Sequence, residues 1–290
     1  MSKKASQDSS RELDQFYTNP SYAQQFWHCV CNTVTVGEFD LVLEPSAGTG
    51  SFYDLLPPDR RTGIDLDPQA PGITQCDFFD WQPPQDSRVL VVGNPPFGKN
   101  ANTAVKFFNR AAEFADAIAF VLPRTFRKPS VIDRLHDRFH CVHDELVPDN
   151  SFEWQGQPYD VWCCAQIWER RSQRRPKRER LKLADFRELF EIVPPYEADF
   201  AIQRVGGRAG LIRTQDFARY SDQSHYFVKQ HDPRVLECFQ ACDWDRVKYN
   251  TVGNPSISPG ELCELWQEQA LKRQIPLTFG NGLFETGVDS

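Results

Sequence analysis

Leu41-Val42-Leu43-Glu44-Pro45-Ser46-Ala47-Gly48-Thr49-Gly50-Ser51-Phe52 is the stretch that decides the fold of this chain. Its apolar first residues are typical of a buried parallel strand, and the small residues after them predict a tight loop that leads into a helix. Small residues let a ligand approach the backbone, and a helix start offers free amides. A dinucleotide-binding loop would need a third glycine at position 53, where this chain has Tyr53. Glu44 would repel a pyrophosphate, so the loop is predicted to bind a cationic ligand.

Around this loop, the first 170 residues alternate between strand and helix patterns. The expected strands are 39–43, 62–65, 73–76, 88–93, 117–122, 141–147 and 161–168, and the expected helices are 21–31, 52–55, 105–114 and 130–139. Strands that alternate with helices form a doubly wound, mostly parallel sheet of the α/β class. The last two strands are separated by a polar loop, so they can pair as an antiparallel hairpin at one edge.

The rest of the chain has a different pattern. Residues 170–182 carry eight basic side chains and one acid, which is typical of a linker or an exposed basic strip. After it, helices over 183–192, 234–242 and 259–271 and a glycine hairpin turn at 205–208 predict a smaller mixed α+β domain. We therefore expect a disordered leader over 1–13, a larger domain over 14–170, a basic linker over 171–182 and a C-terminal domain over 183–290.

The composition excludes several classes of protein. The net charge of −7 argues against a nonspecific nucleic-acid binder, and the basic strip at 170–182 is the main exception to it. No stretch approaches the roughly 20 apolar residues of a membrane span. The nine cysteines include no pair with zinc-ligand spacing. We therefore expect no membrane partner, no metal ion and a reducing compartment.

Two acidic residues follow the next two expected strands. Asp65 ends the strand after the loop, where a carboxylate can accept hydrogen bonds from both hydroxyls of a ribose. Asp77 follows the third strand and can accept from an adenine amino group, while its neighbour Phe78 can cover the adenine ring. A helix-capping acid or a packed aromatic is the ordinary structural alternative for each of them.

The motif Asn94-Pro95-Pro96-Phe97 follows the most apolar strand, so it lies at a carboxyl end, where such sheets bind ligands. The two prolines fix the backbone, so that the Asn94 side-chain oxygen and the Pro95 carbonyl can point at one amine. An aromatic amine is a poor nucleophile because its lone pair is delocalised into the ring. Two acceptors on its N–H groups free that lone pair for methyl transfer without a strong base. Phe97 can stack on the ring that carries the amine.

These motifs resemble those of the S-adenosylmethionine-dependent amino-methyltransferases. The segments 44–50 and 94–97 look like motifs I and IV of that family, and Phe16-Tyr17-Thr18-Asn19-Pro20 looks like its N-terminal motif, which closes over the methionine part of the cofactor. Their order is similar to the gamma arrangement of adenine-N6 methyltransferases. The resemblance covers about residues 14–168 and implies a seven-stranded sheet with S-adenosylmethionine as cofactor. The cofactor-binding residues it implies are Tyr17, Thr18, Pro20, Glu44, Ser46, Gly48, Gly50, Asp65, Asp77 and Phe78.

The resemblance also implies a target, the exocyclic N6 amine of adenine in DNA. In this family an aromatic side chain from the loop between the last two strands faces the catalytic aromatic across a flipped base. Phe152 is the first candidate for this role and Trp154 the second. The candidates for phosphate contacts are Arg124 and Lys128 after the fifth strand, and Arg174 and Arg175 in the basic strip.

Closely similar motifs occur in enzymes that methylate other amines. The first alternative is an RNA adenine-N6 methyltransferase, acting on rRNA or the mRNA cap, and the next is a protein glutamine N5 methyltransferase. A noncatalytic nucleic-acid-binding subunit is disfavoured because Glu44, Asp65, Asn94 and Phe97 are all present. We expect a monomer, located in the cytoplasm if the chain is prokaryotic or viral, with the nucleus as the alternative if it is eukaryotic.

Overall fold

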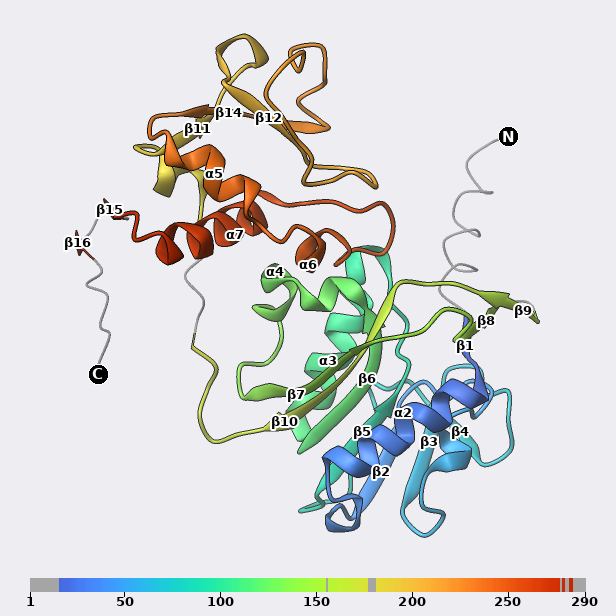
Figure 1. Cartoon of the computed structure of the whole chain (residues 1–290). Coiled ribbons are helices and arrows are strands. Elements are labelled where there is room, and N and C mark those ends of the chain that lie inside the picture. The colour runs from blue at the N-terminus through green and yellow to red at the C-terminus, as the bar shows by residue number, and fades with distance from the viewer. Residues whose placement is uncertain (1–15, 155, 177–180, 277, 280–281, 284–290) are drawn as a thin grey trace. The chain divides into compact units, whose positions relative to one another are not determined.

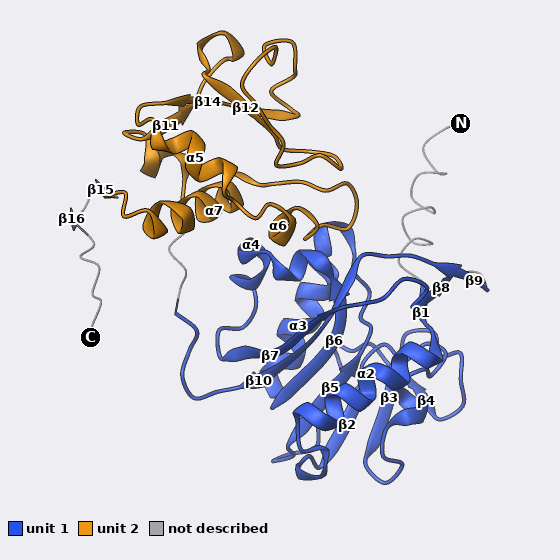
Figure 2. Ribbon diagram, viewed as in Figure 1, with its two compact units in different colours: residues 1–177 blue, residues 178–290 orange. Residues whose placement is uncertain are grey.

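The computed structural model describes residues 16–154, 156–176, 181–276, 278–279 and 282–283, and the leader predicted over 1–13 lies outside these residues. The chain divides into two compact units, residues 1–177 and residues 178–290 (Figure 2). Each unit has its own hydrophobic core, one on a seven-stranded sheet and the other on a four-stranded sheet.

The first unit is built on the seven-stranded sheet shown in Figure 1. Its strands are β2 (Leu41–Glu44), β3 (Arg61–Asp65), β4 (Ile73–Gln75), β5 (Val89–Gly93), β6 (Ala117–Pro123), β7 (Phe139–Leu146) and β10 (Cys163–Arg170). Their order across the sheet is β4-β3-β2-β5-β6-β10-β7, and β10 runs antiparallel to both of its neighbours. The predicted α/β class, the mostly parallel sheet and the antiparallel hairpin at its edge are therefore confirmed.

The order of the strands creates a switch point beside β2. The chain builds β3 and β4 on one side of β2 and then crosses to form β5 on its other side, all four being parallel. The loops after β2 and β5 therefore leave the sheet in opposite directions. This divergence opens a crevice at the carboxyl ends of the strands, which is where open α/β sheets bind ligands.

Helices cover both faces of this sheet. The α-helices are α2 (Pro20–Thr33), α3 (Asn102–Phe114) and α4 (Pro129–Ile132), and the short 3₁₀ helices are η1 (Val36–Glu38), η2 (Tyr53–Leu55), η3 (Lys99–Ala101) and η4 (Arg124–Arg127). In Figure 1, α2 lies in front of the sheet and α3 behind it. Each buries apolar residues at helical spacing, such as Tyr22, Phe26 and Val30 on α2. Among the described residues, none of the helices is both long and apolar enough to cross a membrane.

A small second sheet joins the beginning of the unit to the loop between β7 and β10. It consists of β1 (Tyr17–Thr18), β8 (Phe152–Trp154) and β9 (Gln157–Tyr159), with Thr18 opposite Phe152. The Asn19 amide also donates to the Ser151 carbonyl at 2.9 Å. Two segments more than 130 residues apart, both predicted to serve the active site, are therefore held side by side.

Three helices predicted in this unit differ from the observed ones. The first begins at Pro20 with Asn19 as its cap and ends at Thr33, where the sequence predicted a helix over 21–31. The segment expected as a helix around Phe52 and Leu55 forms only η2. The helix expected over 130–139 stops at Ile132. Beyond that point side chains replace the helical hydrogen bonds, because Arg175 binds the carbonyls of Ile132 and Leu135 and Asn109 binds the His136 amide.

The second unit contains an antiparallel sheet and a pair of packed helices. Its elements are η5 (Leu183–Phe186), β11 (Phe190–Ile192), η6 (Pro195–Glu197), β12 (Phe200–Gln203), β13 (Ile212–Arg213), β14 (His225–Gln230), α5 (Arg234–Gln240), α6 (Asp245–Lys248), α7 (Pro259–Lys272), β15 (Thr278–Phe279) and β16 (Gly282–Leu283). The larger sheet has the order β11-β14-β12-β13. The predicted glycine turn connects β12 to β13, with Gly206 at a φ of +94°.

One predicted helix of the second unit is wrong. The helix expected over 183–192 is a 3₁₀ turn followed by β11, which pairs with β14. Phe186 and Phe190 stack on each other at 5.5 Å, and both contact Trp266 of α7. Pairing with β14 and packing on Trp266 therefore override the local helical pattern.

The cap of α7 gives a test of the second unit. The Ser258 hydroxyl accepts from the Glu261 amide at 3.3 Å, and the Glu261 carboxylate accepts from the Ser258 amide at 2.8 Å. Ser258→Ala is expected to destabilise α7 by about 1 kcal/mol. This corresponds to roughly fivefold faster exchange of the α7 amide hydrogens, measured by mass spectrometry. Ser256→Ala, whose side chain takes no part in a cap, is the control, and equal exchange in the two variants would contradict the prediction.

Candidate active site

A cavity of about 390 Å³ opens in the first unit at the carboxyl ends of β2, β3, β4 and β5. Its volume is within the range of small-molecule sites, about 300–1,000 Å³. Of the residues predicted for the cofactor and catalytic sites, the cavity is lined by Tyr17, Thr18, Glu44, Ser46, Gly48, Asp65, Asp77, Phe78, Asn94, Pro95 and Pro96. The structure thus brings together residues from five separate stretches of the sequence. Pro20, Gly50 and Phe97 do not line it.

Pro20 and Gly50 lie outside the cavity but close in sequence to residues that line it. Pro20 is the first residue of α2. Gly50 has a φ of +87°, and its amide donates to the Ala47 carbonyl, which closes the turn of the predicted cofactor loop. Gly50 therefore acts on the site through the backbone.

Tyr17 lies directly across the predicted cofactor loop. Gly48 has a φ of +46°, and a side chain there would place its Cβ 2.9 Å from the Tyr17 ring. Glycine is therefore required at position 48 both for the backbone conformation and for the close approach of the ring. The Tyr17 ring of the N-terminal strand β1 therefore lies against this loop.

The Asp65 carboxylate ties the end of β3 to this loop. One of its oxygens accepts from the Gly48 amide at 2.8 Å, and the other accepts from the Asp67 amide at 2.8 Å. Each oxygen keeps a second lone pair for a ligand. The side chain is therefore fixed at the cavity wall before any ligand arrives.

The charged groups of the cavity all have one sign. Four carboxylates line it, from Glu44, Asp65, Asp67 and Asp77. Within the described part of the chain, no lysine, arginine or histidine contributes to the lining. Such a wall attracts a cationic ligand and repels a phosphate or pyrophosphate. The structure therefore agrees with the absence of the dinucleotide fingerprint from the sequence.

Glu44 is the most deeply buried of these acids. It is 2% exposed, and its Oε2 has no hydrogen-bond partner in the described protein. Burial raises the pKa of this carboxyl group well above its ordinary value, and a hydrogen bond from the Tyr53 amide offsets only part of the shift. The site thus holds a carboxylate whose charged form is costly until a cation joins it.

Asn94 presents an unused acceptor to the same cavity. Its side-chain Oδ1 is buried and has no partner in the described protein. Its backbone carbonyl accepts from the Ser46 hydroxyl at 3.2 Å, which ties the motif after β5 to the loop after β2. The Thr18 hydroxyl is a third buried polar atom without a partner. Buried polar atoms are rarely left unpaired in a folded protein, so these three mark a place for a polar ligand.

Aromatic side chains form one end of the cavity. Phe78, predicted to cover an adenine ring, is 2% exposed and packs on Phe107 at 5.1 Å. Phe79 and Phe107 also line the cavity, and neither was predicted. Phe79 is 42% exposed, so it presents more free surface to a ring than Phe78 does. Its position beside Asp77 and Phe78 was the sequence signal that could have identified it.

The space predicted for the target base, between Phe97 and Phe152, is filled by a residue of the chain itself. Phe97 and Phe152 are buried, at 6% and 1% exposed, and neither lines the cavity. Phe16 contacts both rings edge to face, at 5.1 and 5.3 Å. Trp154, the second candidate, lies 6.1 Å from Tyr159 in the β8–β9 hairpin. Phe97 and Phe152 therefore belong to one aromatic cluster with Phe16 at its centre. The sequence did not predict this position of Phe16.

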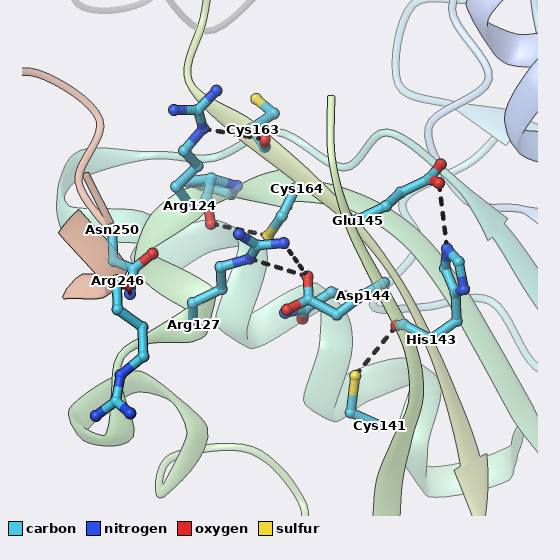
Figure 3. Close-up of polar contacts among 12 residues, drawn as sticks. Arg124, Arg127, Cys141, His143, Asp144, Glu145, Cys163, Cys164, Arg246 and Asn250 are labelled. Carbon is cyan, nitrogen blue, oxygen red and sulfur yellow. Dashed lines mark hydrogen bonds and ion pairs between the residues drawn. The ribbon is translucent and has the colours of Figure 1, made fainter. Parts of the chain in front are cut away.

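The four basic candidates differ in how far they are engaged by the protein. Arg124 donates to the Cys163 carbonyl at 3.4 Å, as Figure 3 shows, and Lys128 directly precedes α4. The guanidinium of Arg175 is bound by three backbone carbonyls between positions 132 and 139, so Arg175 has a structural role. Arg174 is 68% exposed, and among the described residues it pairs only with the surface Asp137, at 3.3 Å. Of these four, Arg174 is the most accessible to a ligand in solution.

No protein-family model matches the chain, and neither does any curated protein sequence. Among solved structures, the chain is similar to a putative RNA methyltransferase from Pyrococcus horikoshii, with 16% identity and a TM-score of 0.42 over 55% of this chain and 88% of that one. It is also similar to a putative class I S-adenosylmethionine-dependent methyltransferase from Listeria monocytogenes, with 14% identity and a TM-score of 0.41 over 56% and 63% of the two chains.

The burial of Glu44 predicts a pH-dependent effect on stability. Because the folded pKa is raised, the folded protein keeps the Glu44 proton at pH values where the unfolded chain has lost it. Glu44→Gln is therefore expected to raise the melting temperature at neutral pH, and the gain should vanish below about pH 4.5, where both states are protonated. Thermal unfolding of the ligand-free protein across this range measures it. Glu38→Gln, an exposed acid, is the control, and a lower melting temperature for Glu44→Gln at pH 7 would contradict the argument.

Proposed function

We propose that this protein is an S-adenosylmethionine-dependent methyltransferase that methylates the exocyclic N6 amine of adenine in DNA. One observation carries the proposal. Among the residues that the structure describes, the cavity is lined by four carboxylates and no basic side chain, and the Asn94 Oδ1 in it has no hydrogen-bond partner. A site for a cation and an acceptor for an amine therefore lie in the same cavity. A nicotinamide oxidoreductase would need that space to accept a pyrophosphate, which the acids disfavour.

The residues of the cavity fit the proposed cofactor. S-adenosylmethionine carries a sulfonium and an ammonium group, and Glu44, with its unpaired Oε2, supplies the buried negative charge that such a ligand needs. Asp65, held at the wall by two backbone amides, would accept from the ribose hydroxyls. Asp77 and the aromatic residues beside it would hold the adenine, and Tyr17 and Thr18 of β1 would cover the methionine end. When bound, this cofactor supplies an electrophilic methyl group.

The motif after β5 would prepare the target amine. Asn94 Oδ1 and the Pro95 carbonyl accept one N–H each, which orients the nitrogen and returns its lone pair from the ring. The hydrogen bond from Ser46 to the Asn94 backbone fixes this motif against the cofactor loop. Methylation would leave a surplus proton on the amine, and Asn94 Oδ1 and the Pro95 carbonyl would hold the N–H groups in place until that proton passes to water. The work of the protein is therefore positioning and charge stabilisation.

A target base would have to reach the aromatic cluster. Phe16 covers both Phe97 and Phe152 in this structure, so a base that stacks on either ring must first displace Phe16. Unstacking a base from a duplex costs a few kcal/mol, and an aromatic contact within the site can return part of that cost. The position of Phe16, next to the strand that covers the cofactor, links base entry to the N-terminal segment.

The proposal is tested by incubating the purified protein with methyl-labelled S-adenosylmethionine and, separately, unmethylated genomic DNA, total RNA and total protein. Hydrolysis of the labelled product then identifies the modified group. N6-methyladenine in DNA is the expected result. Label in RNA or on a glutamine amide would show that RNA or protein is the substrate instead of DNA, and the proposed methyl transfer to a nitrogen would stand. Cofactor binding without any labelled product would overturn the catalytic proposal in favour of a binding subunit.

Two variants should separate catalysis from cofactor binding. Asn94→Ala removes the acceptor for the amine, so we expect the transfer rate to fall roughly a hundredfold or more with little change in cofactor affinity. Asp65→Ala should mainly weaken cofactor binding, because it removes both the ribose acceptor and the anchor of Gly48. Calorimetric titration with the cofactor and single-turnover transfer assays measure the two effects. Near wild-type transfer by Asn94→Ala would remove Asn94 from the mechanism.

The exposed arginines of the basic strip give a test of nucleic-acid binding. Arg171 and Arg174 are exposed, whereas Arg170 and Arg175 bind backbone carbonyls and should be left intact. Replacing Arg171 and Arg174 with serine is expected to reduce the salt slope of DNA binding by about 2, one per lost phosphate contact. Fluorescence anisotropy at several salt concentrations measures the slope. Arg88→Gln, which removes an exposed arginine outside the strip that pairs with Glu38, is the control. An unchanged slope in the double variant would mean that the strip is a linker and does not bind DNA.

A further inference from the structure

Three side chains that can bind a metal ion meet in the first unit away from the active-site cavity. They are Cys29 on α2 and His143 and Glu145 on β7, and their ligand atoms all lie within 4.8 Å of one another. None of the three lines the active-site cavity. His143 and Glu145 are two residues apart on a strand, so their side chains leave the same face of the sheet, as Figure 3 shows for the pair.

The three side chains line a hollow of about 470 Å³ between α2 and the edge of the sheet. Tyr22 lines the same hollow, and its hydroxyl is a buried polar atom without a partner in the described protein. The whole Tyr22 residue is only 4% exposed. An unpaired hydroxyl that faces a group of ligand atoms is a second, independent sign of a missing polar occupant.

The arrangement does not suit a nucleophilic triad. Cys29 Sγ lies 3.3 Å from His143 Nε2, and Glu145 Oε2 lies 3.4 Å from the same nitrogen. In a cysteine–histidine–acid triad the acid must bind the opposite ring nitrogen, so that the imidazole can pass a proton along the chain. Burial also raises the pKa of the Cys29 thiol, which leaves it a weak nucleophile.

A shared cation accounts for both contacts at once. A single ring nitrogen carries either one proton or one lone pair, so it cannot serve both the sulfur and the carboxylate well. Metal–ligand bonds of about 2.3 Å to sulfur and about 2.0–2.2 Å to nitrogen and oxygen would place tetrahedral ligand atoms about 3.4–3.6 Å apart. The observed separations of 3.3 and 3.4 Å are close to those tetrahedral edges.

We propose that Cys29, His143 and Glu145 form a zinc site with a water molecule as the fourth ligand. Sulfur, imidazole and carboxylate together are a set that Zn²⁺ accepts, and softer or harder ions prefer more uniform sets. Binding releases the Cys29 proton to solvent, so that thiolate, neutral imidazole and carboxylate all donate to the ion. The ion would fasten α2 to β7, the edge strand of the sheet. This site is independent of the methyl-transfer chemistry proposed above.

Titration of the untagged, metal-free protein with Zn²⁺ tests the proposal, followed by substitution with Co²⁺. We expect one Zn²⁺ per chain, and with Co²⁺ a near-ultraviolet sulfur-to-metal charge-transfer band together with visible bands of tetrahedral intensity. Cys29→Ser should abolish the charge-transfer band and weaken Zn²⁺ binding about tenfold or more, and His143→Gln should weaken it similarly.

Cys31→Ser is the matched control, because Cys31 is an exposed cysteine on the same helix that does not belong to the cluster. It should keep both the stoichiometry and the charge-transfer band. Absence of the band in the wild-type protein, or its equal loss in both cysteine variants, would overturn the site. Circular dichroism of each variant establishes that it is folded. Since none of these measurements uses methyl transfer, they stand whatever the substrate of the active site proves to be.

Discussion

Glu44 ends β2 with a carboxylate that is almost fully buried, and one of its oxygens has no hydrogen-bond partner among the described residues. A charge in that position is costly, and the sheet places no basic side chain in the described lining of the cavity to neutralise it. The loop and strand ends around it carry further acids, so the cost is not relieved from within the chain. The other residues of the site surround this buried carboxylate, whose charged form a bound cation would stabilise.

The cover of the cavity comes from parts of the chain that are far apart in sequence. β1 passes over the loop after β2, and the absence of a side chain at Gly48 makes room for the Tyr17 ring. β1 itself is held by pairing with β8, from the hairpin between β7 and β10. Movement of the β8–β9 hairpin would therefore also move the cover of the cofactor site. Phe16, next to Tyr17, extends the same segment into the aromatic cluster around Phe97.

The helix that follows this cover also carries Cys29 of the proposed zinc site. α2 begins at Pro20, directly after the cap Asn19, and packs Tyr22, Phe26 and Val30 into the core. A metal ion between Cys29 and β7 would hold the helix at a second point beyond its apolar face. The position of β1, which covers the cavity, would then depend both on the apolar packing of α2 and on the metal ion that binds α2 to β7.

The sequence by itself determined the α/β class, the small-residue loop after β2, the acids at the strand ends and the Asn94 motif, because each is local and its pattern follows from strand period and turn chemistry. It could not determine that Phe16 fills the space between Phe97 and Phe152, or that Arg175 replaces the helical hydrogen bonds after Ile132. It also predicted no metal, since Cys29 and His143 are 114 residues apart and no spacing rule joins them. Those features arise only when β7, β10 and the N-terminal segment pack together, because contacts between distant segments depend on the register of the sheet and leave no periodic signal in the chain.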